Sequence, residues 1–391
     1  MSEPNETPIL LFVDDEKDIL AGLRSTLRKR RQDWDMHFAI GARAALEVVA
    51  DLPVDVIVSD MRMPGKDGAS FLAEAREIRP EAVRIVLSGH ADDGATMRGL
   101  AVAQQWLAKP CARDQLLRSL ELALTARRLI RDTEKRMRLG GIESLPSPPA
   151  TLEHIQFLVA DPDCRIQDLA ETIEQDPAVA AKILQLANSS FFNLAQEVTS
   201  LEAAIPRLGL DTIAALVVSE SVFQSVARKG NHPVSEVEAL QRHSLLCARL
   251  SGRIAREVAL GDEQLLPSAF TSGLLHDVGR LLVIGTEWEG EDCAALGAGL
   301  LAAWGLPMRI VESVARHQAL FAIPGEPDLA SVCVHAAHHL LCEIEEKLVR
   351  GVHGPGSIDP AVPELLGGEP DLETLRQMAS DFFDLAAEEG H

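Results

Sequence analysis

Four apolar runs near the start of the chain end in side chains that could take part in phosphoryl chemistry. They are Asp14-Asp15 after residues 9–13, Asp60 after 54–59, Ser88 after 83–87 and Lys109 after 105–108. Open parallel α/β sheets place their ligand sites at the carboxyl ends of the strands. We therefore expect these side chains to meet at one edge of a sheet.

The chemistry that this set favours is acceptance of a phosphoryl group by Asp60. A carboxylate can act as a nucleophile, but both partners are anionic, and Mg²⁺ suits carboxylate and water ligands. We expect Asp15 and Asp60 to be direct ligands and Asp14 to act through water. Lys109 would supply positive charge and Ser88 a hydrogen bond. Any one of these residues alone would most simply be a solvated strand end, and only their joint order favours a site.

The first 125 residues alternate strand and helix patterns, which predicts a parallel sheet covered on both faces. The fifth expected strand core lies at 36–39. Amphipathic segments lie near 17–31, 42–50, 68–78, 92–103 and 113–125.

Residues 9–125 resemble a response-regulator receiver domain, a flavodoxin-like α/β fold. The resemblance rests on Asp14-Asp15, the run from Asp60 through Met63-Pro64 to Asp67-Gly68, Ser88-Gly89 and Lys109-Pro110. It implies a histidine kinase as partner, a cis peptide before Pro110, and the Arg62 carbonyl as a further metal ligand. It also implies that Ser88 and Trp106 reorient on phosphorylation, although Trp106 could equally be ordinary core packing.

A helix from Asp114 to Leu139, stopped by Gly140-Gly141, is expected to couple the domains. Its apolar stripe could pair two chains as a homodimer or pack on its own receiver, and Arg127 interrupts it. The stripe consists of Leu116, Leu120, Ala123, Ile130 and Met137. We place the receiver at 1–125, a helical and Pro-rich linker at 126–149, and a second domain at 150–391.

The second domain shows only helical periodicity, so it is predicted to be all-α. Helices are expected at 150–160, 166–173, 177–190, 200–208, 211–227, 235–259, 265–284, 293–303, 307–320, 328–348 and 371–387. Asp176 would cap the helix that begins at Pro177, and residues 351–370 would form a loop.

His276-Asp277 lies in an apolar segment of this domain, with further histidines at 243, 317, 335, 338 and 339. Such residues on facing helices can bind a metal. A buried histidine is more often satisfied by a carbonyl or carboxylate, and the residues alone leave both readings open.

Residues 142–391 resemble the HDOD family, the HD-related output domain. The signals include Leu145 to Pro149, Asp176-Pro177, Leu184 to Ser189, Phe191-Phe192, Leu208 to Leu210, Gly273 to Gly279 and Trp304 to Pro307. The resemblance implies a mostly helical fold with a signalling role and usually no catalysis.

The departures from catalytic HD enzymes point the same way. His243, His276 and Asp277 match those enzymes. The position of their later aspartate holds His338, and a position where a relative has a histidine holds Cys293. Where relatives have two adjacent histidines, this chain has His317-Gln318, and it has no Tyr. We therefore expect no cofactor in this domain, with residual zinc on His243, His276, Asp277 and His338 as the alternative.

Charge and composition narrow the classes of partner. The net charge is −22, and residues 142–391 carry 15 basic and 37 acidic residues, which argues against nucleic-acid binding. The polar start predicts no secretory signal. The uncharged stretch 293–308 is too short to span a membrane. Six cysteines without CxxC pairing predict reduced thiols and a cytoplasmic protein.

The sequence thus predicts a cytoplasmic two-domain response regulator that binds a downstream signalling protein and neither nucleic acid nor membrane. The rival hypothesis is a receiver-gated, metal-dependent HD phosphohydrolase using His243, His276 and Asp277.

Overall fold

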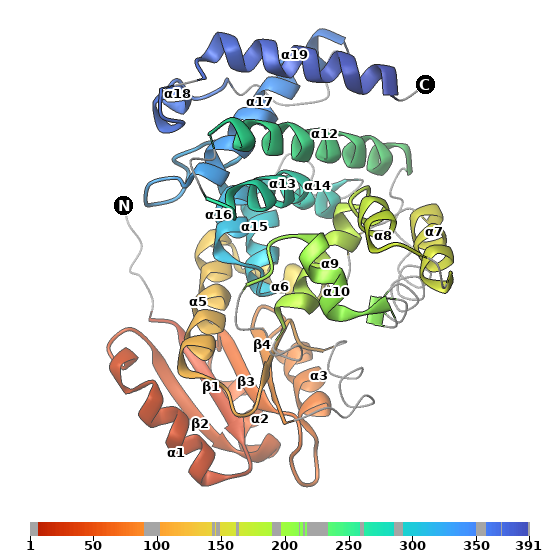
Figure 1. Cartoon of the computed structure of the whole chain (residues 1–391). Helices are drawn as coiled ribbons and strands as arrows, with labels where there is room; N and C mark the ends of the chain where they lie inside the picture. The colour runs from red at the N-terminus through yellow and green to blue at the C-terminus, as the bar shows by residue number, and fades with distance from the viewer. Residues whose placement is uncertain are drawn as a thin grey trace. The chain divides into compact units, whose positions relative to one another are not determined.

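Five parallel strands form the sheet of the first part of the chain in the computed structural model (Figure 1). They are β1 (Ile9–Asp14), β2 (Asp35–Ile40), β3 (Val56–Asp60), β4 (Val83–Ser88) and β5 (Gln105–Ala108). Their order is β2-β1-β3-β4-β5. The register pairs Asp60 with Leu87 and Ser88 with Ala108. The predicted flavodoxin-like sheet is confirmed.

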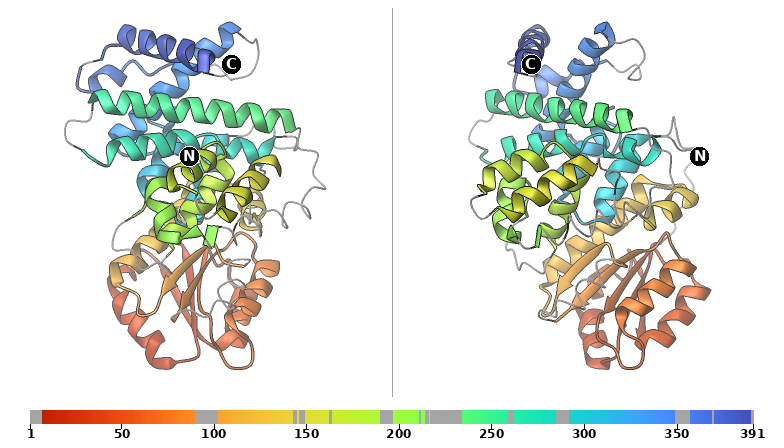
Figure 2. Two further views of the ribbon diagram at one scale, coloured as in Figure 1. Left: turned by 45° about the vertical axis from the view of Figure 1, so that its right-hand side comes forward. Right: turned by 90° about the vertical axis from the view of Figure 1, so that its right-hand side faces the viewer.

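Helices cover both faces of this sheet because its strands are apolar on both sides. Helices α1 (Lys17–Thr26) and α5 (Arg113–Leu129) pack on one face, with the short 3₁₀ helix η1 (Arg28–Arg30) after α1. Helices α2 (Gly41–Asp51) and α3 (Gly68–Ile78) pack on the other (Figure 2). The predicted helix at 92–103 lies almost wholly outside the described residues.

The structure describes residues 7–89, 102–142, 145, 149–161, 164–189, 197–210, 212–213, 216, 234–258, 262–284, 292–348, 357–368 and 370–389. The chain divides into two units, one made mainly of residues 1–143 and the other mainly of residues 144–391.

The predicted continuous helix from Asp114 to Leu139 is wrong. Helix α5 ends at Leu129, Ile130 is extended, and a separate helix α6 (Thr133–Gly140) follows. The break has a local cause, because the Asp132 side chain accepts hydrogen bonds from the amides of Glu134 and Lys135 at 2.8 and 3.2 Å. An aspartate that caps a new helix end cannot also continue the old helix.

The apolar stripe of α5 is used inside its own receiver. Leu116, Leu120 and Ala123 are buried in the core shared with β1 and β3. Arg127, which interrupts the stripe, lies beside Asp55 with Nε 2.6 Å from Oδ1. For these three residues the outcome matches the alternative of a helix packed on its own receiver, and the homodimer stays a prediction.

Helix α6 ends in close contact with the same receiver. The Gly140 carbonyl accepts from Arg84 Nη2 at 2.6 Å and from Gln104 Nε2 at 3.2 Å. A Cβ at Gly140 would lie 1.7 Å from the Pro80 carbonyl oxygen, so only glycine can approach here. The segment predicted as a linker is therefore attached to the receiver through residue 140.

The second unit is helical over its described residues, as predicted. Its helices are α7 (Pro149–Ala160), α8 (Ile166–Ile173), α9 (Pro177–Asn188), α10 (Leu201–Leu208), α12 (Val234–Val258), α13 (Leu265–Leu275), α14 (Val278–Val283), α15 (Cys293–Ala303), α16 (Met308–Arg316), α17 (Leu329–Leu348), α18 (Val362–Leu365) and α19 (Leu372–Glu389). Asp176 caps α9 as predicted, accepting from the Ala178 amide at 2.9 Å.

Two predicted segments differ in detail. The helix expected at 265–284 is two helices, α13 and α14, divided at His276-Asp277. The loop expected at 351–370 contains the short helix α18. Most of the helix expected at 211–227 lies outside the described residues. Helices α12, α13, α17 and α19 share one apolar core, which positions the histidines described below (Figure 1).

Candidate functional site

The carboxyl edge of the sheet brings three of the predicted side chains together. Asp14 ends β1, Asp60 ends the neighbouring β3, and Lys109 follows β5. Lys109 Nζ lies 2.7 Å from Asp14 Oδ2 and 2.5 Å from Asp60 Oδ1. One ammonium therefore bridges two carboxylates that come from segments 46 residues apart along the chain.

Burial makes this arrangement electrostatically strong. Asp14 is 1% exposed and Asp60 is 7% exposed, so water screens their charges weakly. Burial disfavours the charged form of Lys109, but its hydrogen bonds to Asp14 and then Asp60 outweigh that effect and raise its pKa above the ordinary value. Lys109 is therefore a fixed cation at this edge.

The loop after β3 holds Asp60 in place. The Arg62 amide donates to Asp60 Oδ2 at 2.9 Å. Gly68 begins α3 so close to the strand that a Cβ there would lie 2.1 Å from the Asp60 carbonyl oxygen. Asp67 caps the same helix by accepting from the Ser70 amide at 2.9 Å. The run from Asp60 to Gly68 is thus a tight turn that fixes the carboxylate.

Lys109 is held by the neighbouring strand. Its amide donates to the Ser88 carbonyl at 2.7 Å, and the peptide bond from Lys109 to Pro110 is cis, as the family resemblance implied. The Ser88 hydroxyl donates to the Gly89 carbonyl at 3.0 Å, so in this structure it contacts its neighbour. Trp106 is buried in the core beside α2 and α3. The switch roles of Ser88 and Trp106 stay predictions.

The residues at this edge suit the magnesium ion that the fold implies. Asp15 is half-buried beside Asp14, and Mg²⁺ prefers such carboxylate oxygens. The ammonium of Lys109 already lies between Asp14 and Asp60, which shows that the site accepts a cation. The ligand roles of Asp14, Asp15, Asp60 and the Arg62 carbonyl stay predictions.

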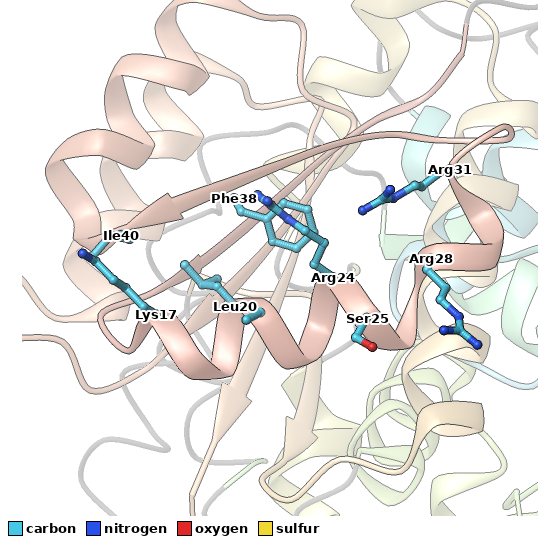
Figure 3. A pocket seen from close by; sticks show the side chains of 9 residues that line it. Lys17, Leu20, Arg24, Ser25, Arg28, Arg31, Phe38 and Ile40 are labelled. Atoms are coloured by element: carbon cyan, nitrogen blue, oxygen red, sulfur yellow. The ribbon is translucent and has the colours of Figure 1, made fainter.

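A basic groove of about 500 Å³ lies along α1 and β2 (Figure 3). Its basic lining residues are Lys17, Arg24, Arg28 and Arg31. The Arg24 guanidinium carbon lies 4.5 Å from the centre of the Phe38 ring, a cation–π contact. At the end near Lys17, Ile40 is 48% exposed. The groove thus offers positive charge and apolar surface on a chain whose net charge is −22.

A second constellation lies inside the helical unit. His243 comes from α12, His276 and Asp277 from the junction of α13 and α14, and His338 from α17. One ligand atom from each lies within 4.8 Å of all the others, and all four residues are buried. The structure therefore brings together the four residues that the sequence predicted as a residual HD site.

Hydrogen bonds orient two rings of this cluster. His276 Nδ1 lies 2.6 Å from the Gly273 carbonyl, and His317 Nδ1 lies 2.7 Å from the Val314 carbonyl. A carbonyl only accepts, so each Nδ1 carries a proton, and in a neutral ring the Nε2 is then the acceptor. Burial lowers the pKa of His276 to about 3, which keeps its ring neutral.

The cluster includes two residues that the predicted set left out. His317 Nε2 lies 3.4 Å from Asp277 Oδ1; His317 is among the histidines that the sequence indicated in this domain, but it is not part of the predicted residual HD site. Cys342 Sγ lies 3.8 Å from His338 Nε2. The four-residue spacing of His338 and Cys342 on one helix face could have revealed it. Cys293 lies near enough for Asp277 to contribute, after burial, to raising its thiol pKa to about 11.

His335 and His339 lie outside this cluster. His335 Nδ1 donates to the His317 carbonyl at 3.0 Å, and its Nε2 accepts from the Asp359 amide at 3.1 Å. His339 Nε2 lies 3.1 Å from the Gln318 carbonyl. These contacts are those of structural histidines.

Family comparisons match two separate parts of the chain. Residues 10–121 match the response regulator receiver domain, and residues 145–289 match the HDOD domain. The chain is a receiver–HDOD response regulator. Its phosphoacceptor edge falls within the receiver match, whereas His317 and His338 of the helical cluster lie beyond the HDOD match.

The relatives of this response regulator include two transcriptional regulators and a sensor kinase. It is 38% identical over 137 residues to the hydrogenase transcriptional regulatory protein HoxA of Cupriavidus necator, covering 34% of this chain and 27% of HoxA. It is 27% identical over 194 residues to the C4-dicarboxylate transport transcriptional regulatory protein DctD of Rhizobium meliloti, covering 46% of this chain and 40% of DctD. It is 35% identical over 111 residues to the sensor kinase CckA of Brucella abortus, covering 27% of this chain and 11% of CckA. The matches thus span at most two fifths of these relatives.

Among solved structures, the response regulator is similar to the signal receiver domain of an HD domain-containing protein from Pseudomonas fluorescens Pf-5. The identity is 30%, the match covers 32% of this chain and 98% of that one, and the TM-score is 0.30. An adenylate cyclase from Rhodopirellula baltica is 25% identical; the match covers 34% of this chain and 98% of that one, with a TM-score of 0.31. Within the described residues, no helix is both long enough and apolar enough to cross a membrane.

Proposed function

We propose that a histidine kinase phosphorylates Asp60 and that this event controls a non-catalytic HDOD output that binds another signalling protein. The observation that carries the proposal is the bridge from Lys109 to both Asp14 and Asp60 at 2.7 and 2.5 Å. It supplies a buried nucleophilic carboxylate together with the cation that an incoming phosphoryl group needs.

The transfer follows from these contacts. An Asp60 oxygen attacks phosphorus, the O–P bond forms, and the P–N bond of the donor phosphohistidine breaks as its electron pair returns to the imidazole. Lys109 is placed to exchange its contact with Asp60 for one with a phosphoryl oxygen. Asp14, Asp15 and Asp60 would hold Mg²⁺, which supplies charge neutralisation at the phosphoryl oxygens.

The basic groove on α1 supports a docking surface for the phosphodonor. Lys17 opens α1 two residues after Asp15, and Ile40 ends β2 at the same edge of the sheet. Lys17→Glu with Arg24→Glu should slow phosphotransfer from a phosphorylated histidine kinase but leave labelling by acetyl phosphate unchanged. Arg43→Glu, on the exposed surface of α2, is the matched control. Equal slowing with both donors would contradict docking at the groove.

The proposed output is protein binding, and the rival is a gated HD phosphohydrolase. The helical part carries most of the negative charge of the chain, which favours protein partners over nucleic acid. The clustering of His243, His276, Asp277 and His338 is the observation that keeps the enzyme hypothesis as a second candidate.

A comparative pull-down tests the proposed output. Wild type and Asp60→Asn are treated with acetyl phosphate and Mg²⁺, and captured proteins are identified by mass spectrometry. Asp51→Asn, which changes an exposed aspartate at the end of α2, is the control. We expect a partner whose capture depends on Asp60 and is unchanged in Asp51→Asn. Identical capture by all three proteins would contradict control of the output by Asp60.

A further inference from the structure

We propose that His243, His276, Asp277 and His338 form a closed transition-metal site of the zinc class, whose ion binds the helical unit together. The inference is independent of Asp60 phosphorylation. It begins from Asp277, a carboxylate that is 1% exposed. Neither of its oxygens accepts a hydrogen bond of normal geometry from the described residues. A buried carboxylate in such surroundings requires a compensating cation.

The nearest nitrogens compensate this carboxylate only at a distance. His276 Nε2 lies 3.6 Å from Asp277 Oδ2, and His317 Nε2 lies 3.4 Å from Oδ1. The neutral His276 ring donates its Nδ1 proton to a carbonyl, so its Nε2 is an acceptor and offers this anion no proton. The Arg280 guanidinium forms a longer ion pair with Oδ2, at 3.7 Å. None of these contacts has the length of a charge-assisted hydrogen bond, and a cation bound beside Asp277 would complete its compensation.

The hydrogen bonds around the cluster are those of metal-ligating histidines. Such a histidine donates its other ring N–H to a carbonyl or carboxylate, which fixes the tautomer and the ring orientation. His276 does this through Gly273, at 2.6 Å. The Nε2 lone pair of His276 is therefore directed at the centre of the cluster. His317, whose Nδ1 lies 2.7 Å from the Val314 carbonyl, lies beside Asp277 and outside the proposed ligand set.

The donor set selects the class of metal. Two nitrogens bound to one tetrahedral zinc ion at ~2.0–2.1 Å lie about 3.3 Å apart. His338 Nδ1 and His276 Nε2 are separated by 3.2 Å, a hydrogen bond that a bound ion would replace. Three imidazoles and one carboxylate suit zinc, iron, nickel or copper, whereas magnesium prefers an all-oxygen set. His338 stands where catalytic HD enzymes have an aspartate, and this moves the site towards nitrogen ligands.

Burial makes the proposed site structural. The four side chains come from three separate stretches of helix, and none is more than 7% exposed. Four protein ligands complete a tetrahedral shell, and a catalytic zinc would need an open position for water. An ion here would join α12, the α13–α14 junction and α17. The free energy of metal binding would then add to the free energy of folding of this unit.

Metal analysis of the full chain, purified without a histidine tag, tests the proposal. After chelation and dialysis, the protein is loaded with Zn²⁺, Mn²⁺ or Mg²⁺, and bound metal and thermal unfolding are measured. We expect about one retained Zn²⁺ per chain, a higher unfolding temperature with Zn²⁺, and no such rise with Mg²⁺. Wild type that retains no zinc and shows no shift would overturn the proposal.

Variants separate the site from surface binding and from misfolding. Asp277→Asn, which keeps the side-chain shape, should lose zinc retention while circular dichroism shows the helices intact. His154→Ala, at an exposed histidine of α7, should keep it, as should Asp60→Asn. His338→Asp should bind metal but shift its preference from Zn²⁺ towards Mn²⁺. An unchanged preference in His338→Asp, or zinc retention in Asp277→Asn, would contradict the assigned ligands.

Discussion

Lys109 Nζ lies 2.5 Å from Asp60 Oδ1, and the same ammonium lies 2.7 Å from Asp14. Phosphorylation of Asp60 would alter this pair directly, because the modified carboxylate loses its charge while the phosphoryl group brings new anionic oxygens. Phosphorylation of Asp60 would therefore change the contacts of Lys109 directly.

Replacing Lys109 by alanine should weaken signalling but preserve Mg²⁺ binding. The substitution removes a charge-assisted bond worth ~1.5–3 kcal/mol, so phosphorylation-dependent partner binding should fall by about tenfold or more. Mg²⁺ affinity should stay the same or rise, because a competing cation has left the two carboxylates. Calorimetric Mg²⁺ titration and a partner-binding assay measure both effects. Lys66→Ala, which removes an exposed lysine paired with Glu74, is the control, and unchanged output in Lys109→Ala contradicts the role.

Gly140→Ala should detach the end of α6 from the receiver. Its Cβ would lie 1.7 Å from the Pro80 carbonyl oxygen, and overpacking of this kind costs about 1–3 kcal/mol. Gly141→Ala is a matched control, since its nearest contact would be an ordinary 3.5 Å. Hydrogen exchange should show faster exchange across residues 133–142 in Gly140→Ala alone. Equal protection in both variants would show that the packing of α6 matters little.

Acid should destabilise the helical unit through His335. Burial, followed by the neighbouring His339, lowers its pKa from 6.5 to about 4, and its Nε2 accepts from the Asp359 amide. The unfolded chain therefore binds the extra proton, and stability that is complete above about pH 6.5 falls as pH drops towards 4. The expected loss between about pH 7 and pH 5 is ~2 kcal/mol. Urea unfolding at both pH values should show a smaller loss in His335→Gln, and equal losses would exclude His335 as a source.

No hydrolysis of cyclic di-GMP or nucleoside phosphates is expected from the helical unit. The chain has no Tyr, His338 replaces the later HD aspartate, and the cluster is buried. A hydrolytic metal needs an open position for water. Assays with Mg²⁺, Mn²⁺ and Zn²⁺ should show no turnover above background. Turnover that disappears in His276→Ala would establish the gated enzyme instead.

The meeting of Asp14, Asp60 and Lys109 could be predicted from the sequence because all three follow apolar runs. The carboxyl ends of parallel strands share one edge whatever the details of packing. The grouping of His243, His276, Asp277 and His338 followed from the family resemblance, and the residues alone left it open.

Features that depend on tertiary contacts could not be predicted from the pattern of apolar residues in the sequence. The break between α5 and α6 follows from capping by Asp132 and from the ion pair that holds Arg127, near the end of α5, to Asp55. Helical periodicity continues through that break, so it gave no sign of it. His317 and Cys342 join the histidine cluster only after α16 and α17 pack, although the spacing from His338 to Cys342 was a usable signal.

Phosphorylation with a small donor tests whether Asp60 is the phosphoacceptor. The purified chain is treated with acetyl phosphate and Mg²⁺, and its intact mass is measured beside Asp60→Asn and the control Asp51→Asn. We expect a gain of about one phosphoryl group in wild type and in Asp51→Asn, with none in Asp60→Asn. Labelling that survives in Asp60→Asn would contradict the assignment of Asp60 as the phosphoacceptor.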